Sequence, residues 1–172
     1  LSIRRQRQMC IRDSIRLAAA KFGYETTGAE LDVIARKPLI DRGFDFNHGT
    51  GHGVGHMLSV HEGPNTISRR GDKCCMAPGM ITSDEPGVYF AGEYGIRLEN
   101  EILCKEDKNG LCFETITLCP FDREAIDVNM LEDDELEFLN RYHGRVYDIL
   151  KDYLDENEAK WLMKQTEPLQ KQ

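Results

Sequence analysis

The chain has 172 residues, enough for one domain with its own hydrophobic core, because domains of about 100–200 residues are common. No apolar run approaches the roughly 20 residues that cross a bilayer, and no secretory signal is evident, so we expect a cytoplasmic protein without a membrane partner. A net charge of −8 disfavours nucleic acid as a partner, since phosphate-binding proteins concentrate Lys and Arg on one face.

The six cysteines are expected to be free thiols. Their spacing forms no regular framework, and the adjacent Cys74 and Cys75 rarely pair with each other in proteins. There is no CxxC pair, so a zinc site built from cysteines is not expected.

Residues 1–14, LSIRRQRQMCIRDS, differ from everything that follows. They are basic, they lack hydrophobic periodicity, and they stop where a good amphipathic pattern begins at Ile15. The string resembles translated sequencing-adapter sequence. We therefore expect a non-native or disordered leader that takes no part in the fold.

Two helices are expected after the leader. Residues 15–22, IRLAAAKF, are strong helix formers, and Gly23 stands where such a helix would end. Thr27 and Glu30 then have the spacing of a capping box ahead of apolar residues spaced for one buried face. Pro38 is expected to kink or end this second helix.

Residues 43–95 predict strands and loops, because glycines and prolines alternate with short apolar segments. An antiparallel hairpin is expected next, with strands at 96–104 and 111–118 and a polar turn at 105–110. The C-terminal part predicts a long amphipathic helix over 131–154 and a short closing helix over 155–168, whose Trp161 we interpret as a packing anchor.

A glycine-rich segment of fourteen residues contains four of the five histidines: His48, His52, His56 and His61. Neutral imidazoles are common ligands of divalent metals, and glycines let the backbone approach an ion closely. Downstream, Glu85 and Glu99 lie among apolar or small residues, where an ionised carboxylate needs a partner such as a metal. This mixed donor set suits Mn²⁺, Co²⁺, Fe²⁺ or Zn²⁺, and a carboxylate can bridge two ions.

Other interpretations of these residues are weaker. His52 and His56 have the spacing of an HExxH zinc helix, but the glutamate is absent and glycines disfavour a helix there. The segment HGTGHGVG also lacks the GxGxxG spacing of a dinucleotide loop. We expect His56 to be structural or solvent-facing, His143 to be a surface or satisfied core residue, and Glu62 to orient the loop rather than bind metal. Asp84 and Glu93 are interpreted as ordinary turn residues.

Two stretches, FNHGTGHGVGHMLSVHEGP and PGMITSDEPGVYFAGEYGIRLENEIL, resemble the signature pair of the Xaa-Pro aminopeptidases, which belong to the pita-bread metallopeptidase family. The similarity extends from about Ile15 to about Leu169 and includes CPFDREAID. It implies an α+β fold in which an antiparallel sheet is covered by helices. Residues 15–120 would be the C-terminal half of a pita-bread (creatinase/aminopeptidase) domain, and residues 121–172 a C-terminal helical extension.

The resemblance also implies roles for single residues. His52, Glu85 and Glu99 match the family's metal ligands, with Glu99 in the bridging place between two divalent ions, for which the family suggests Mn²⁺. Glu85 would also be the general base in the hydrolysis of peptides with proline in the second position. His48 and His61 match substrate-side histidines, and Arg97 matches an arginine that supports the ligand carboxylates.

In this family two further aspartate ligands and another histidine precede the segment that the chain matches. Asp13 cannot replace them, because it is too close to His52 in sequence. We therefore expect a fragment of a homo-oligomeric aminopeptidase that binds metal weakly and shows little turnover by itself. Two alternatives are a catalytically inactive pita-bread module that binds peptides or proteins, and a prolidase. The complete set of matching site residues disfavours the first, and the stretches HGTGHGVGHMLSVHEGP and CPFDREAID disfavour the second.

Overall fold

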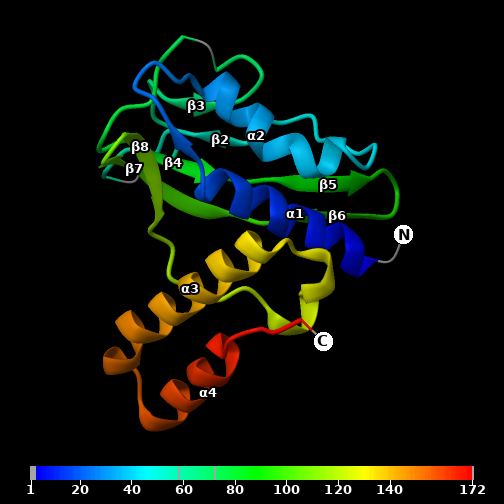
Figure 1. Cartoon of the computed structure of the whole chain (residues 1–172). Coiled ribbons are helices and arrows are strands. Elements are labelled where there is room, and N and C mark those ends of the chain that lie inside the picture. The colour runs from blue at the N-terminus through cyan, green and yellow to red at the C-terminus, as the bar shows by residue number, and fades with distance from the viewer. Residues whose placement is uncertain (1–2, 58, 72, 172) are drawn as a thin grey trace. The chain divides into compact units, whose positions relative to one another are not determined.

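The computed structural model describes residues 3–57, 59–71 and 73–171 (Figure 1). The chain forms two compact units, which are described separately. The sheet unit is Met9–Thr117, and the helical unit comprises Leu1–Gln8 and Leu118–Gln172. Within the described ranges, no helix has the length and apolar character that a membrane span needs.

The first helix, α1, spans Ile3–Ala18, so the described part of residues 1–14 is helical and not the disordered leader that the sequence suggested. Met9, Cys10 and Ile11 are at most 1% exposed, and burial of apolar side chains stabilises a helix of this length. The helix also ends earlier than predicted, because Lys21–Phe22 form strand β1. The adapter-like origin of the segment stays a prediction.

Helix α2 spans Gly28–Ile40 and begins with the predicted capping box. The backbone N–H and the hydroxyl of Thr27 donate to Glu30 Oε2 at 2.8 and 2.9 Å. Pro38 lies in the last turn, and the helix ends two residues later. Gly28 approaches strand β3 (Thr66–Ile67) so closely that a Cβ atom would stand 1.7 Å from Thr66 O. Only glycine allows this contact between helix and strand.

The main sheet has four strands in the order β1-β8-β7-β4, and all its neighbours are antiparallel. Strand β4 is Ile81–Asp84, β7 is Asn100–Asp107 and β8 is Gly110–Thr115. The predicted hairpin is therefore present as β7 and β8, but residues 96–97 belong to an earlier strand. The alternation of apolar and polar residues runs through both strands, so the pattern alone does not locate the boundary.

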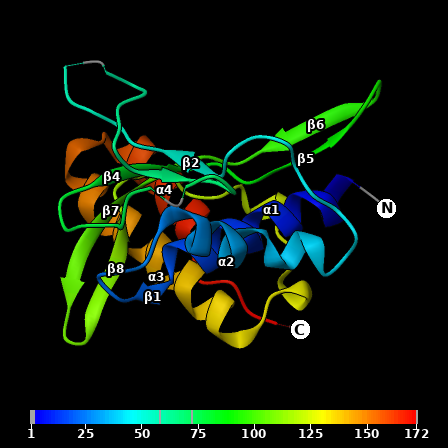
Figure 2. The same cartoon turned by 90° about the horizontal axis from the view of Figure 1, so that it is seen from above.

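Two short antiparallel hairpins complete the sheet unit. Strand β2 (Gly51–His52) pairs with β3, and β5 (Gly87–Phe90) pairs with β6 (Tyr94–Arg97). A bridge between Gly53 and Thr82 joins β2 to the edge of the main sheet at β4. Helices α1 and α2 lie on the same face of this sheet (Figure 2).

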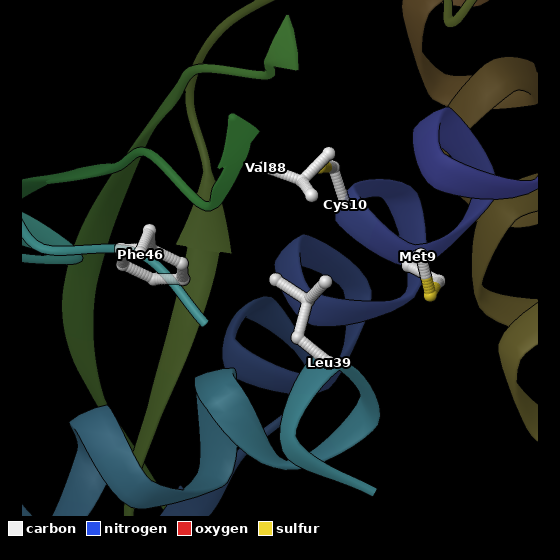
Figure 3. Packing of buried hydrophobic residues seen from close by; sticks show 5 residues of the cluster. All are labelled: Met9, Cys10, Leu39, Phe46 and Val88. Atoms are coloured by element: carbon white, nitrogen blue, oxygen red, sulfur yellow. The ribbon is translucent and has the colours of Figure 1, made fainter. Parts of the chain in front are cut away.

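A buried apolar cluster connects α1, α2 and strand β5 (Figure 3). Its members are at most 2% exposed: Met9, Cys10, Leu39, Phe46 and Val88. Burial raises the pKa of the Cys10 thiol to about 12, so the thiol stays neutral and packs as an apolar group. All six cysteines are free, as predicted.

The helical unit is built on α3 (Asp133–Leu150) and α4 (Glu156–Thr166). Their bounds agree closely with those of the helices predicted over 131–154 and 155–168. Both helices start with a capping box, and acidic residues occupy their first turns, where the helix dipole favours negative charge. Short 3-10 turns occur in the same unit at Arg123–Ala125, Val128–Met130 and Lys151–Tyr153.

Two contacts define the end of this unit. The side chain of Asn140 accepts a hydrogen bond from Leu169 N at 2.8 Å and donates one to Leu169 O at 3.0 Å, which ties the C-terminal segment to α3. Trp161 on α4 is 59% exposed, so the prediction that it is a packing anchor is wrong. The buried face of α4 carries Leu162 and Thr166 instead.

Candidate metal centre

Strand β2 presents the histidine-rich loop to the end of strand β4. Gly51 approaches β4 so closely that a Cβ atom would stand 1.9 Å from Ser83 O, which only glycine permits. The backbone N–H of His52 donates to the hydroxyl of Ser83 at 2.9 Å. His52 is thereby fixed beside the residues that follow β4.

His52 and Glu85, two of the three predicted ligands, are in contact. His52 Nε2 lies 3.2 Å from Glu85 Oε1, while His52 Nδ1 lies 3.0 Å from the carbonyl of Gly53. When Nδ1 donates to that carbonyl, the neutral ring turns a lone pair at Nε2 toward a carboxylate oxygen. A proton or a cation between His52 Nε2 and Glu85 Oε1 could be bound by both of these acceptor atoms.

Glu85 is held through both its side chain and its backbone. Its Oε1 accepts a hydrogen bond from the Ser83 hydroxyl at 2.6 Å, and its backbone N–H donates to Thr50 O at 2.7 Å. The side chain is 13% exposed. The carboxylate is therefore oriented but still open to a small molecule.

Glu99, the third predicted ligand, is connected to this pair through Arg97. Arg97 Nε lies 3.8 Å from Glu85 Oε2 and 3.9 Å from Glu99 Oε2, and the Arg97 and Glu99 side chains are about half exposed. In the part of the chain that the structure describes, no group of three or more His, Cys, Asp or Glu side chains is arranged to hold an ion. The donor chemistry fits a divalent metal, but only two of the three predicted ligands meet.

The remaining loop histidines differ in their surroundings. The His61 ring lies against the His52 ring, with centroids 4.1 Å apart. His48 Nε2 lies 2.7 Å from Tyr89 Oη, and His48 Nδ1 lies 2.7 Å from Gly49 O. His56 is exposed at a bend. The backbone N–H of Glu62 donates to Gly53 O at 2.9 Å, which closes the loop.

A buried polar network that the sequence analysis missed supports the loop from α2. Arg36 donates to Asp32 Oδ2 and to His48 O, each at 2.7 Å, and both charged side chains are at most 3% exposed. The Thr50 hydroxyl donates to Asp32 Oδ1 at 2.5 Å. The carbonyl of Thr50 in turn accepts from Glu85, so α2 holds both halves of the site. Opposite charges at i,i+4 beside the buried positions Leu31 and Ala35 were the available signal.

Asp84 is fully buried at the end of β4, which corrects its interpretation as an ordinary turn residue. It accepts a hydrogen bond from the Ser14 hydroxyl at 2.7 Å, and burial raises its pKa. Asp13 on α1 is also buried, and among the described residues neither of its carboxylate oxygens has a hydrogen-bond partner. Burial, together with the charge of Asp84, raises the pKa of Asp13 to about 9. Asp13 is consequently a neutral buried acid near pH 7.

His143, the fifth histidine, is a core residue of the helical unit. It is fully buried on α3, and its Nε2 accepts a hydrogen bond from Phe121 N at 3.1 Å. Burial, with a smaller contribution from the charge of Arg123, lowers its pKa to about 4. Its neutral ring therefore serves packing.

Comparison with known sequences assigns the chain to a protein family. A model of metallopeptidase family M24 matches residues 8–106, and a model of the C-terminal region of these peptidases matches residues 109–169. The chain belongs to metallopeptidase family M24. The family match begins inside residues 1–14.

Particular relatives are aminopeptidases P. Aminopeptidase P1 of Lotus japonicus is 44% identical over 168 residues, which cover 92% of this chain and 26% of the relative. Aminopeptidase P1 of Arabidopsis thaliana is 41% identical over 165 residues, covering 90% of this chain and 26% of the relative. The chain thus spans about a quarter of the length of the curated relatives that it matches.

Solved structures confirm the fold class. X-prolyl aminopeptidase from Caenorhabditis elegans, described as a cytosolic enzyme with a di-nuclear active site, has a TM-score of 0.89 and 36% identity, covering 96% of this chain and 29% of that chain. Prolidase from Pyrococcus furiosus has a TM-score of 0.55 and 34% identity, covering 64% of this chain and 31% of that chain. The chain is the C-terminal part of a pita-bread domain with an α+β fold.

Proposed function

We propose that the protein containing this chain is a metal-dependent aminopeptidase that releases the N-terminal residue from peptides with proline in the second position. The contact of His52 Nε2 with Glu85 Oε1 at 3.2 Å carries the proposal, because it brings together an imidazole and a carboxylate from the two stretches that resemble the family signature. The names of the aminopeptidase P relatives support the substrate class. The chain by itself should bind metal weakly, since it brings together only two of its three proposed ligands.

His52, Glu85 and Glu99 are the proposed ligands, and two divalent ions, first of all Mn²⁺, are the proposed cofactor. The description of the Caenorhabditis elegans enzyme as di-nuclear supports two ions. When bound, such ions supply Lewis-acid polarisation of the scissile carbonyl and lower the pKa of a water molecule. Arg97 lies within 4 Å of both carboxylates and is proposed to keep them oriented.

Glu85 is also the proposed general base. The Ser83 hydroxyl fixes Oε1, so the carboxylate presents one orientation to a water molecule at the site. The proton that Glu85 accepts would pass to the proline nitrogen as the peptide bond breaks.

His48 and His61 are proposed to contact the peptide. Each ring is positioned by a neighbour, His48 by Tyr89 Oη and His61 by the His52 ring. An imidazole N–H can donate a hydrogen bond to the oxygen on which negative charge develops. For His48, whose ring nitrogens contact Gly49 O and Tyr89 Oη, the peptide would have to replace one of these contacts. A cytoplasmic location is proposed from the likeness to a cytosolic enzyme, and assembly into a homo-oligomer stays a prediction.

The test is hydrolysis of a short Xaa-Pro peptide in the presence of Mn²⁺. This chain would be compared with the same chain joined to the upstream part of Aminopeptidase P1 from Lotus japonicus. We expect turnover in the joined protein and little in the chain alone. Glu85→Gln should lower kcat/KM by about 10²–10⁴-fold, because the amide cannot accept the proton.

The matched control is Glu93→Gln, which makes the same chemical change at an exposed residue in the turn between β5 and β6. It should retain the parent activity. A joined protein that folds, binds the peptide and does not cleave it would favour the peptide-binding module instead. Equal losses of kcat/KM in Glu85→Gln and Glu93→Gln would contradict the role of Glu85 as the general base.

A further inference from the structure

A pocket of about 400 Å³ opens in the sheet unit beside His48, and no role has been assigned to it. Polar and charged side chains dominate its lining: Arg36, Asn47, His48, Ser68, Arg69 and Arg70. The pocket does not include His52, Glu85 or Glu99. It shares His48 with the residues proposed to contact the peptide, and it therefore lies beside the proposed metal ligands.

The charge of this pocket is positive. Arg36 forms the buried wall, where its Nη1 donates to Asp45 Oδ1 at 2.8 Å in addition to the Asp32 contact. Arg69 pairs with the same Asp45. Arg70 forms no ion pair with a described residue and is exposed. Among the described residues, these three guanidinium groups face the two carboxylates of Asp32 and Asp45, an excess of one positive charge.

Hydrogen bonds connect the buried wall of the pocket to the proposed reaction centre. Arg36 holds the carbonyl of His48, and the Asp32 that it binds also accepts from the Thr50 hydroxyl. Thr50 O receives the backbone N–H of Glu85 at 2.7 Å. The wall that Arg36 forms is therefore joined to Glu85 by a chain of hydrogen bonds.

Charge decides which part of a peptide this pocket accepts. An aminopeptidase substrate carries an α-ammonium group on its N-terminal side, and a site with excess positive charge repels it. The residues beyond the proline can carry carboxylates, and a guanidinium binds a carboxylate through two parallel hydrogen bonds.

We propose that the Arg70 pocket binds a carboxylate of the substrate on the C-terminal side of the proline, so that peptides with an acidic group there are preferred. This inference rests on the proposed aminopeptidase function. The carboxylate has two possible sources, an acidic side chain or the C-terminus of a short peptide.

The experiment uses the joined, Mn²⁺-loaded enzyme and C-terminally amidated peptides Ala-Pro-Xaa-Xaa in which both Xaa residues are Glu, Gln or Lys. We expect kcat/KM for the Glu peptide to exceed that for the Gln peptide about five- to tenfold at low salt, and the Lys peptide to be the poorest. Added salt should reduce the ratio. The Gln peptide with a free C-terminus tests the terminal carboxylate separately.

Arg70→Gln should bring the Glu-to-Gln ratio close to one, and Arg70→Lys should restore part of it. Lys73→Gln, which removes an exposed charge outside the pocket lining, should keep the parent ratio. Calorimetric binding of the same peptides to the Glu85→Gln enzyme gives a readout without turnover, and it should show the same order.

The outcomes separate this inference from the function on which it rests. If no Xaa-Pro peptide is cleaved, the proposed function fails. If the Gln peptide is cleaved while Glu, Gln and Lys peptides give equal kcat/KM and equal affinity, only the carboxylate subsite is overturned. A ratio that persists in Arg70→Gln would also overturn it.

Discussion

The guanidinium of Arg36 is surrounded by acceptors. It meets the carboxylates of Asp32 and Asp45 and the carbonyls of Phe46 and His48, all between 2.7 and 2.8 Å. A charge buried this deeply is tolerated only when each of its donors is bonded. At the residue scale, this one side chain fixes the backbone on which the proposed site is built.

Asp32→Asn should lower the free energy of unfolding by about 3 kcal/mol, because it leaves the buried charge of Arg36 short of one partner. Urea denaturation followed by circular dichroism measures the change. Lys37→Gln is the control on the same helix, since it breaks the exposed i,i+4 pair with Asp41 and should change stability little. Equal denaturation midpoints for parent and Asp32→Asn would contradict the role of the buried pair.

The lowered pKa of His143 makes the stability of the helical unit depend on pH. Its folded pKa of about 4 lies below the unfolded value of 6.5, so folding favours the neutral ring. The contribution of the neutral ring to the free energy of unfolding is complete above pH 6.5. It is lost as the pH falls toward 4, by about 3 kcal/mol in total.

His143→Gln should flatten the pH dependence between 6.5 and 4, while its carbonyl can still accept from Phe121 N. The measurement is the difference in unfolding free energy between variant and parent at several pH values. Taking the difference cancels the opposite trend from the raised pKa values of Asp13 and Asp84. A pH-independent difference would show that His143 does not titrate as described.

At the scale of elements, two glycines on helices have opposite environments. A Cβ atom at Gly28 would stand 1.7 Å from Thr66 O, whereas at Gly144 on α3 it would meet nothing within 4 Å. Gly28→Ala should therefore destabilise the chain by at least about 2 kcal/mol, because α2 must move off β3. Gly144→Ala should stabilise it by about 0.5–1 kcal/mol through helix propensity. Chemical denaturation of both variants tests the pair, and a loss of stability in each would contradict it.

Local patterns predicted the elements that local forces determine. The capping box at Thr27 and Glu30 and the amphipathic pattern of α3 both identified real helices. Strand β1 was missed because Lys21 and Phe22 follow good helix formers, and their state depends on pairing with Leu111 and Cys112 far along the chain. The N-terminal helix was missed because its buried apolar residues are consecutive and lie among arginines.

The same distinction holds at the candidate site. His52 and Glu85 were predicted from motif resemblance, and the structure brings them together. Ser83, Thr50 and Tyr89 were missed, because each is hydrogen-bonded to a site residue far from it in sequence. Ser83 bonds to His52, Thr50 to Glu85 and Tyr89 to His48. The sequence SDEPG is typical of a turn, so the inclusion of Asp84 in a strand was not predicted.

At the scale of the whole molecule, the free thiols report on both units. Cys119 in the helical unit is exposed, whereas Cys10 and Cys104 in the sheet unit are fully buried. Burial raises the pKa of Cys10 to about 12 and that of Cys104 to about 11, which further suppresses their thiolates.

Iodoacetamide at mildly alkaline pH should therefore modify Cys119 at least about tenfold faster than Cys10 or Cys104. Peptide-level mass spectrometry over time gives the three rates. All six cysteines should react quickly in concentrated guanidinium, which is the control. Similar rates for Cys10 and Cys119 in buffer would show that the core around α1 opens readily.

The exposed position of Trp161 gives the chain an optical label. The sequence contains one tryptophan, and it lies on α4 in the helical unit with 59% of its surface exposed. Indole fluorescence excited at the red edge of its absorption therefore comes from that unit alone, whereas circular dichroism sums over both. The unfolding of the helical unit can thus be followed separately from that of the whole chain, without any dye attached to the protein.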